Sequence, residues 1–254
     1  MATSALKQCI LTSNASLTPI RTELEPRLRS LRGIRCVAFD VYGTLLISGS
    51  GDISTVQEDV SANLKEAILR AHAFRRQDGI EYPEVDIRAI WREILGRDEV
   101  DMHAIEYETR SNPVWPMPGM RTVLEELSGF TLGIVSNAQF YTPLTLEAFL
   151  GGSLATIGFH PEHTVWSYRE LEAKPSPRLF QRLLDATGIC AKETLYIGND
   201  MLNDVWAASQ LGIRTALFAG DQRSLRLRED RNECNVLEPD LVITELNQIR
   251  LCLS

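Results

Sequence analysis

Short apolar runs that end in polar residues or glycine recur along this chain. They lie at Cys36 to Phe39, Thr131 to Val135 and Leu195 to Ile197. Continuous runs of this length are typical of strands buried on both faces of a parallel sheet. Helices are expected between them, around 120–127 and 178–186, and residues 237–251 should close the domain with a strand and a helix. The alternation predicts an α/β fold with a doubly wound parallel sheet.

The stretch 48–112 follows a helical rather than a strand pattern. It opens with Ser48-Gly49-Ser50-Gly51, a composition typical of a hinge, and ends at the proline-rich segment 112–118. Two series of apolar residues have helical spacing: Val56, Val60, Leu64, Ile68, Ala71 and Phe74, then Ile87, Ile90, Trp91, Ile94 and Leu95. We therefore predict an all-helical cap over 48–112, inserted into a catalytic core made of 34–47 and 113–254.

Residues 1–33 precede the first predicted strand and form an N-terminal extension. Its first 18 residues are polar and have no long apolar core, which argues against a secretory signal. Residues 19–31 are compatible with a short helix broken at Pro26 or, as we favour, with a flexible or loosely docked segment.

Composition narrows the choice of partners and compartment. The chain has 254 residues, a net charge of −8 and a pI near 5.1, which argues against nucleic acid or an anionic membrane as a partner. No apolar stretch approaches the ~20 residues of a membrane span. The five cysteines are scattered without a Cys-x-x-Cys pair, which favours the reduced cytoplasm.

Asp40 is the strongest candidate for a reactive group. It follows a predicted buried strand, and ligands of open α/β sheets gather at the carboxyl ends of strands. Gly43 permits a sharp turn directly afterwards, and Thr44 offers a hydroxyl and an amide to an anion beside Asp40. This arrangement is typical of a displayed nucleophile, although a lone aspartate before a turn usually has only a structural role.

Two later segments supply further candidates. Ser136 and Asn137 end another apolar run and can donate hydrogen bonds to an anion, while the structural alternative is a helix cap or a turn. Lys174 precedes two prolines that fix the start of a helix. A lysine at such a place is usually solvated.

The fourth candidate segment places two carboxylates four residues apart. Asp200 and Asp204 follow the run ending at Gly198, and on one helix face such a pair repels by a few tenths of a kcal/mol. A divalent cation, Lys174 or the positive end of the helix could offset the repulsion. The structural alternative is that Asp200 caps the helix and Asp204 is solvated.

Taken in order, these segments resemble the four motifs of the haloacid dehalogenase superfamily of aspartate-nucleophile hydrolases. The motifs correspond to 39–45, 135–137, 174–175 and 198–204, and the resemblance covers about 34–47 and 113–219. It implies that Asp40 attacks the substrate and that the helical insert is a mobile cap that selects it. The candidate catalytic residues are Asp40, Tyr42, Thr44, Ser136, Asn137 and Lys174.

The resemblance also implies a Mg²⁺ site. The expected ligands are the carboxylates of Asp40, Asp200 and Asp204 together with the backbone carbonyl of Tyr42, with water completing the shell. Asn199 occupies a position where many relatives have the first acid. Which of Asn199, Asp200 and Asp204 touches the metal stays open.

The chain departs from the phosphatases of the superfamily at one position and from its dehalogenases at others, and both differences bear on the reaction. Most phosphatases of the superfamily have a general-acid aspartate where this chain has Tyr42, and a phenol with a pKa near ~10 protonates an alkoxide poorly. The L-2-haloacid dehalogenases also have tyrosine there. They lack most acids of the fourth motif, however, use no metal, and have a tyrosine where this chain has Phe180.

We therefore expect a Mg²⁺-dependent phosphatase of a small, anionic phosphorylated metabolite. A metal-free 2-haloacid dehalogenase is the first alternative. The second is a catalytically weak member that binds a ligand or a protein through its cap.

Overall fold

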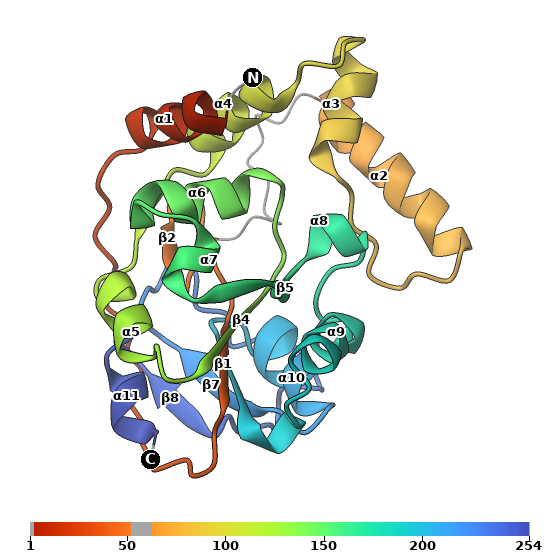
Figure 1. Ribbon diagram of the computed structural model, residues 1–254. Coiled ribbons are helices and arrows are strands. Elements are labelled where there is room, and N and C mark those ends of the chain that lie inside the picture. Colours follow the sequence, from red (N-terminus) through yellow and green to blue (C-terminus); the bar gives the residue numbers. More distant parts are fainter. Residues whose placement is uncertain (1–2, 52–61, 254) are drawn as a thin grey trace.

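The computed structural model describes residues 3–51 and 62–253. Its main sheet consists, from one edge to the other, of β5 Phe159–Trp166, β4 Thr131–Ser136, β1 Cys36–Phe39, β6 Thr194–Gly198, β7 Arg214–Phe218 and β8 Leu241–Ile243. All neighbouring strands pair in parallel (Figure 1). The parallel sheet that the sequence predicts is confirmed.

The central strand β1 sets the position of the candidate nucleophile. Phe39, its last residue, pairs with Ile134 of β4 on one side and Ile197 of β6 on the other. After β5 the chain crosses to the opposite side of β1 and begins β6. The carboxyl ends of β4, β1 and β6 therefore meet where the strand order reverses, which is where open α/β sheets bind their ligands.

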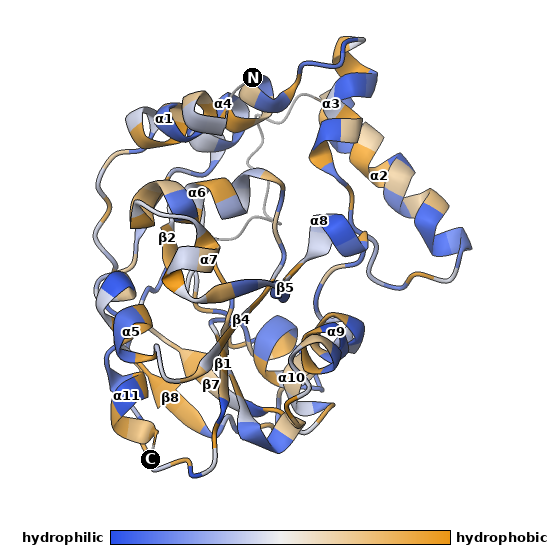
Figure 2. Ribbon diagram, in the orientation of Figure 1, coloured by the Kyte–Doolittle hydropathy of each residue, from blue (hydrophilic) through white to orange (hydrophobic). Residues whose placement is uncertain are grey.

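Alternate residues of the strands pack against two layers of helices, because successive side chains point to opposite faces of a sheet. Ala38 and Tyr196 pack with one layer and Val37 and Phe39 with the other. The first layer contains α9 Pro177–Thr187 and α10 Ala207–Ser209. The second contains α5 Met120–Glu126, α6 Tyr141–Leu150 and α11 Gln248–Cys252. The strands are correspondingly apolar and the outer helix faces polar (Figure 2).

Shorter elements connect these layers. They are α7 Leu154–Ile157, α8 Ser167–Glu170, a 3₁₀ turn Ala191–Glu193 and a π-helical segment Met201–Trp206. No helix within 3–51 and 62–253 combines the length and the apolarity that a membrane-spanning segment needs.

The insertion leaves and returns through a small two-stranded sheet. β2 Leu46–Ser48 pairs antiparallel with β3 Val114–Pro116. At this junction the Asn112 side-chain oxygen accepts hydrogen bonds from the Ser48 hydroxyl (2.7 Å) and the Ser50 amide (3.1 Å). The described part of the insertion comprises α2 Ala62–Gln77, α3 Ile87–Leu95 and α4 Asp101–Ser111.

The predicted apolar stripes contribute part of the core of the insertion. Leu64, Ile90 and Trp91 are buried, and the Trp91 ring packs edge-on against His103. Phe74 differs, because it is 64% exposed near the free end of α2, which projects away from α3 (Figure 1). Val56 and Val60, also expected in the first stripe, lie outside the described residues.

The N-terminal extension contains the helix α1 Thr3–Ser13, which packs against α4 of the insertion and α6 of the core (Figure 1). Asn14 follows it and accepts a hydrogen bond from the Val114 amide (2.7 Å). Residues 19–31 form no helix, so that alternative is wrong. The extended backbone instead pairs at Arg27 with Val242, which satisfies polar groups at the edge of β8.

Candidate active site

Asp40 lies one residue beyond β1, at the edge of the crevice. Its amide donates to the Ile197 carbonyl (2.8 Å), which extends the pairing with β6. Its side chain is only 10% exposed, and Oδ1 accepts a hydrogen bond from Lys174 Nζ at 2.7 Å. Within the described residues Oδ2 accepts no hydrogen bond.

Gly43 allows the turn after Asp40 to pass close to neighbouring segments. It has φ +80°, and a Cβ there would lie 2.5 Å from Ser224 and 2.8 Å from Asn199. Next to it, the Thr44 hydroxyl donates to Asn199 Oδ1 (3.1 Å), and Asn199 Nδ2 donates to the Ser224 carbonyl (2.7 Å). The turn is therefore fixed against both β6 and the segment around 221–228.

Lys174 enters the site from the loop before α9. The Ser176 side chain caps this helix and Pro177 is its first residue, which fixes the entry angle of the loop. Lys174 Nζ contacts Asp40 at 2.7 Å and Asp204 at 2.5 Å, and the side chain is only 3% exposed. Burial acts to lower the pKa of Lys174, but the negative charges of Asp204 and Asp40 outweigh this effect. The pKa is therefore raised above its usual value, and the ammonium stays charged.

The second predicted segment contacts the lysine loop. Asn137 Oδ1 accepts a hydrogen bond from the Lys174 amide (2.7 Å), and its Nδ2 donates to the Lys174 carbonyl (3.4 Å). Ser136 is buried, and its hydroxyl donates to the Asn137 carbonyl (3.3 Å). In this arrangement Asn137 holds the backbone of the lysine.

The fourth segment begins with a carboxylate cap. Asp200 Oδ1 accepts from the amides of Leu202 (2.8 Å) and Asn203 (3.1 Å) at the start of the π-helical segment. Asp204 Oδ2 accepts from the Asp200 amide (2.9 Å), and its Oδ1 contacts Lys174. Burial raises the pKa of Asp204 to about 7, although Lys174 opposes the shift.

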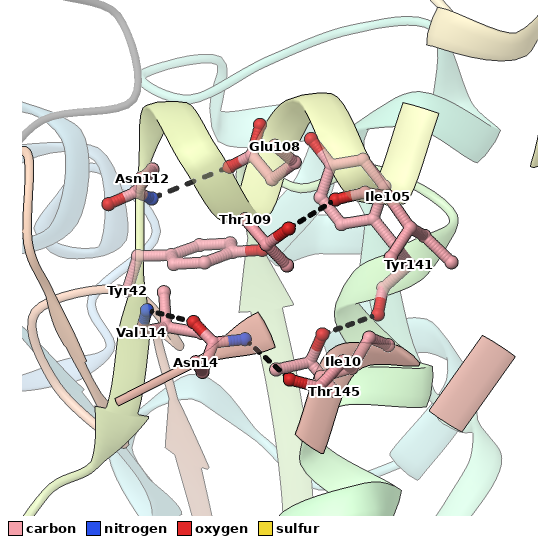
Figure 3. Close-up of a pocket in the computed structure, with 10 residues that line it drawn as sticks. All are labelled: Ile10, Asn14, Tyr42, Ile105, Glu108, Thr109, Asn112, Val114, Tyr141 and Thr145. Carbon is pink, nitrogen blue, oxygen red and sulfur yellow. Dashed lines mark hydrogen bonds between the residues drawn. The ribbon is translucent and has the colours of Figure 1, made fainter. Parts of the chain in front are cut away.

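Tyr42 lines a small cavity between the core and the insertion (Figure 3). Its hydroxyl shares a hydrogen bond with the Thr142 hydroxyl (2.9 Å). Glu108 of α4 and Tyr141 of α6 line the same cavity. Burial, and then the charge of Glu108, raise the pKa of Tyr42, so the phenol stays neutral.

The structure thus brings together Asp40, Lys174 and Asp204, with Asn137 and Thr44 in the surrounding loops. Two contributors were not found from the sequence. Tyr196 of β6 places its hydroxyl 3.2 Å from Lys174 Nζ, and Arg228 contacts Asp200 at 2.5 Å. Tyr196 is part of an apolar run, and Arg228 belongs to a run of mixed charge, so neither pattern indicated a site.

The potential metal ligands are already engaged within the protein. Asp200 is held by Arg228 and Asp204 by Lys174. Across 3–51 and 62–253, no three His, Cys, Asp or Glu side chains converge as a group that could hold a metal. Carboxylates are hard oxygen ligands of the kind that Mg²⁺ prefers, but a cation bound by Asp200 would have to displace Arg228.

Solved structures with the same fold include two dehalogenases. L-2-haloacid dehalogenase from Xanthobacter autotrophicus, with chloropropionic acid covalently bound, is 20% identical with a TM-score of 0.56. 2-Haloacid dehalogenase from Pseudomonas syringae pv. Tomato DC3000 is 20% identical with a TM-score of 0.58. Each match covers 86% of this chain and 97% of the other. At this identity the likeness concerns the fold alone.

Curated relatives with detectable sequence similarity are phosphatases. Glyceraldehyde 3-phosphate phosphatase from Pyrococcus abyssi is 32% identical over 108 residues, which are 40% of this chain and 42% of the relative. Phospholysine phosphohistidine inorganic pyrophosphate phosphatase from Rattus norvegicus is 29% identical over 134 residues, 50% of this chain and 48% of the relative. The chain spans about half the length of the curated relatives it matches.

The family model for haloacid dehalogenase-like hydrolases matches residues 34–212, well over half of the chain. This range contains the four motifs on which the resemblance rested. The chain therefore belongs to the haloacid dehalogenase-like hydrolases.

Proposed function

We propose that the chain is a phosphatase of small phosphorylated metabolites that uses Asp40 as its nucleophile. The observation that carries the proposal is the placement of Lys174 Nζ between Asp40 (2.7 Å) and Asp204 (2.5 Å) at the switch point of the sheet. A buried ammonium there compensates the charge of the nucleophile and of an incoming anion. The phosphatase names of the curated relatives support this substrate class.

The proposed reaction has two displacements at phosphorus. Asp40 Oδ2 attacks the phosphoryl group, the bond from phosphorus to the leaving oxygen breaks, and an aspartyl phosphate forms. Water then attacks the same phosphorus atom, which releases inorganic phosphate and regenerates the carboxylate. The leaving oxygen takes up a proton in the first step, and the attacking water loses one in the second.

The surrounding loops have positioning roles in this proposal. Asn137 fixes the backbone of Lys174 through two hydrogen bonds, so that the ammonium approaches Asp40 from one direction. Thr44 lies in the turn that follows β1 and Ser136 is the last residue of β4, where amide and hydroxyl groups can bind phosphoryl oxygens. The Tyr42 hydroxyl shares a hydrogen bond with Thr142, and in this proposal Tyr42 does not act as the proton donor.

We also propose Mg²⁺ as the cofactor. Asp40, the backbone carbonyl of Tyr42 and the acids Asp200 and Asp204 would hold it, with Asp200 available only after Arg228 releases it. Bound Mg²⁺ would neutralise charge on the transferring phosphoryl group.

A metal-free 2-haloacid dehalogenase is the second candidate, and the environment of Tyr42 favours it. A neutral, buried phenol turned toward Thr142 leaves the site without an evident acid for an alkoxide, whereas halide leaves without a proton. Asp40 would then attack carbon, and water would hydrolyse the resulting ester at its carboxyl carbon.

A substrate panel separates the two candidates. Purified protein is assayed against phosphate monoesters and L-2-haloacids, each with Mg²⁺ and with EDTA. The proposal expects turnover of phosphate esters that EDTA abolishes. Haloacid turnover that is insensitive to EDTA would establish the second candidate, and no turnover of either class would favour a ligand-binding protein.

A further inference from the structure

The ammonium of Lys174 has three N–H donors and finds three acceptors. Asp40 Oδ1 lies at 2.7 Å, Asp204 Oδ1 at 2.5 Å and Tyr196 Oη at 3.2 Å. The lysine side chain is 3% exposed, so water contributes little to its solvation. Two of these acceptors are carboxylate oxygens, and the third is the neutral hydroxyl of Tyr196.

The hydroxyl of Tyr196 is oriented by the strand on the other side of β1. It donates its single proton to the Val135 carbonyl of β4 at 2.6 Å. Because that proton is committed, the lone pairs of Oη face Lys174, and the 3.3 Å approach to Asp204 Oδ1 is a secondary contact.

The ring of Tyr196 is held equally firmly. It is buried in β6 and meets the Phe180 ring of α9 edge-on, with centroids 4.8 Å apart. Phe180 belongs to the helix that begins just after the Lys174 loop. Ring and hydroxyl therefore link β4, β6 and α9 around one ammonium.

We propose that Tyr196 is a positioning residue, whose hydroxyl fixes the ammonium of Lys174 between Asp40 and Asp204. Without it, Lys174 would retain both carboxylates but lose the contact that sets its direction. The inference deepens the proposed function, since it rests on Lys174 acting beside the nucleophile Asp40.

The kinetic test removes the hydroxyl and keeps the ring. Tyr196→Phe should lower kcat by about 10- to 100-fold, the range expected when a charged catalytic group shifts by a fraction of an ångström to 1 Å. KM should change little, because Tyr196 is buried and its hydroxyl contacts Val135 and Lys174. Thr194→Val is the matched control, since it deletes another buried hydroxyl of β6, whose bond goes to the Cys190 carbonyl. Its kcat should stay near wild type.

A spectroscopic measurement tests the inference without any substrate. In protein labelled with ¹⁵N at lysine Nζ, the ammonium of Lys174 should give a slowly exchanging signal, assigned by its loss in Lys174→Met. Tyr196→Phe should shift this signal and accelerate its exchange with water, and Thr194→Val should leave it in place.

A second variant covers the case in which Tyr196→Phe does not fold. Phe180→Leu retains the hydroxyl but loosens the ring that carries it, so kcat should fall by a smaller factor and the lysine signal should shift. Wild-type kcat and an unmoved signal in the folded variants would overturn the inference. Absence of any turnover in the wild type would contradict the proposed function alone, and the lysine signal would still decide the role of Tyr196.

Discussion

Arg228 binds Asp200 through both carboxylate oxygens. Its Nη2 lies 2.5 Å from Oδ2, and its Nε lies 3.2 Å from Oδ1 and 3.1 Å from Oδ2. Asp204, four residues on, has a cation of its own in Lys174. The repulsion expected between these two acids is therefore offset by two separate basic side chains, and a metal ion is not required to hold them together.

This pairing makes Arg228 a competitor of any Mg²⁺ that binds Asp200. Arg228→Gln should lower the Mg²⁺ concentration for half-maximal activity by roughly fivefold, because a partly exposed charge-assisted pair contributes about 1 kcal/mol. Arg226→Gln, which removes the same charge from a side chain that donates to backbone carbonyls, is the control.

An unchanged Mg²⁺ requirement in Arg228→Gln would show that Asp200 only caps the π-helical segment and does not bind Mg²⁺. A melting temperature of the wild type that does not respond to Mg²⁺ would favour the metal-free dehalogenase.

Tyr42 distinguishes the two candidate reactions. Tyr42→Asp should provide a carboxyl beside Asp40 and raise phosphatase turnover, since positioned acid catalysis commonly contributes ~10²–10⁴-fold. The gain should be largest for alkyl phosphates and smallest for p-nitrophenyl phosphate, whose leaving group is a stable anion. In a dehalogenase the added negative charge should instead slow attack on an anionic haloacid.

The control for this substitution is Tyr42→Phe, which keeps the ring in its cavity and removes only the hydrogen bond to Thr142. It should leave the dependence on the leaving group unaltered. If Tyr42→Asp gains nothing on any phosphate ester and loses haloacid turnover, the ranking of the two reactions is reversed.

Glu84 joins the insertion to α8 and should make stability depend on pH. Its Oε2 accepts from the Ser167 hydroxyl (2.9 Å), and burial raises its pKa. A raised folded pKa contributes stability below the unfolded value near ~4.3, and this stability is lost as pH rises through the folded value. Glu84→Gln should therefore be more stable than wild type at pH 8, with the difference shrinking toward pH 4.

Thermal unfolding across this pH range checks the prediction. Glu81→Gln, which removes an exposed carboxylate from the same segment, should show no such trend. A difference between Glu84→Gln and wild type that is constant from pH 4 to pH 8 would show that ionisation of Glu84 is not its cause.

The sequence predicted the features that depend on local pattern. Apolar runs located β1, β4 and β6, and the polar residues at their ends identified Asp40 and Asn137. Parallel strands bring their carboxyl ends to one edge, so these residues could be placed together before any coordinates were known. The helical character of the insertion followed from residue spacing in the same way.

Contacts between distant segments could not be predicted. Asn199 binds the Ser224 carbonyl and Asp200 binds Arg228, and no spacing rule relates these positions. Residues 19–31 do not form the helix that was considered as an alternative, because Arg27 pairs with the edge of β8, a tertiary contact that no local pattern indicates. Tyr196 was overlooked because its polar atom is only one part of a largely apolar side chain.

Covalent capture on Asp40 tests the central claim most directly. Enzyme mixed with substrate in a single turnover is quenched rapidly, digested and analysed by mass spectrometry, with Asp40→Asn as a folded control that cannot attack. We predict a transient phosphoryl group on Asp40 of the wild type and none in the variant. When the reaction runs in ¹⁸O-water, the released phosphate should carry the label. Label in the Asp40 carboxyl would instead identify the dehalogenase reaction. A phosphoryl group on another residue, or wild-type turnover by Asp40→Asn, would contradict the mechanism.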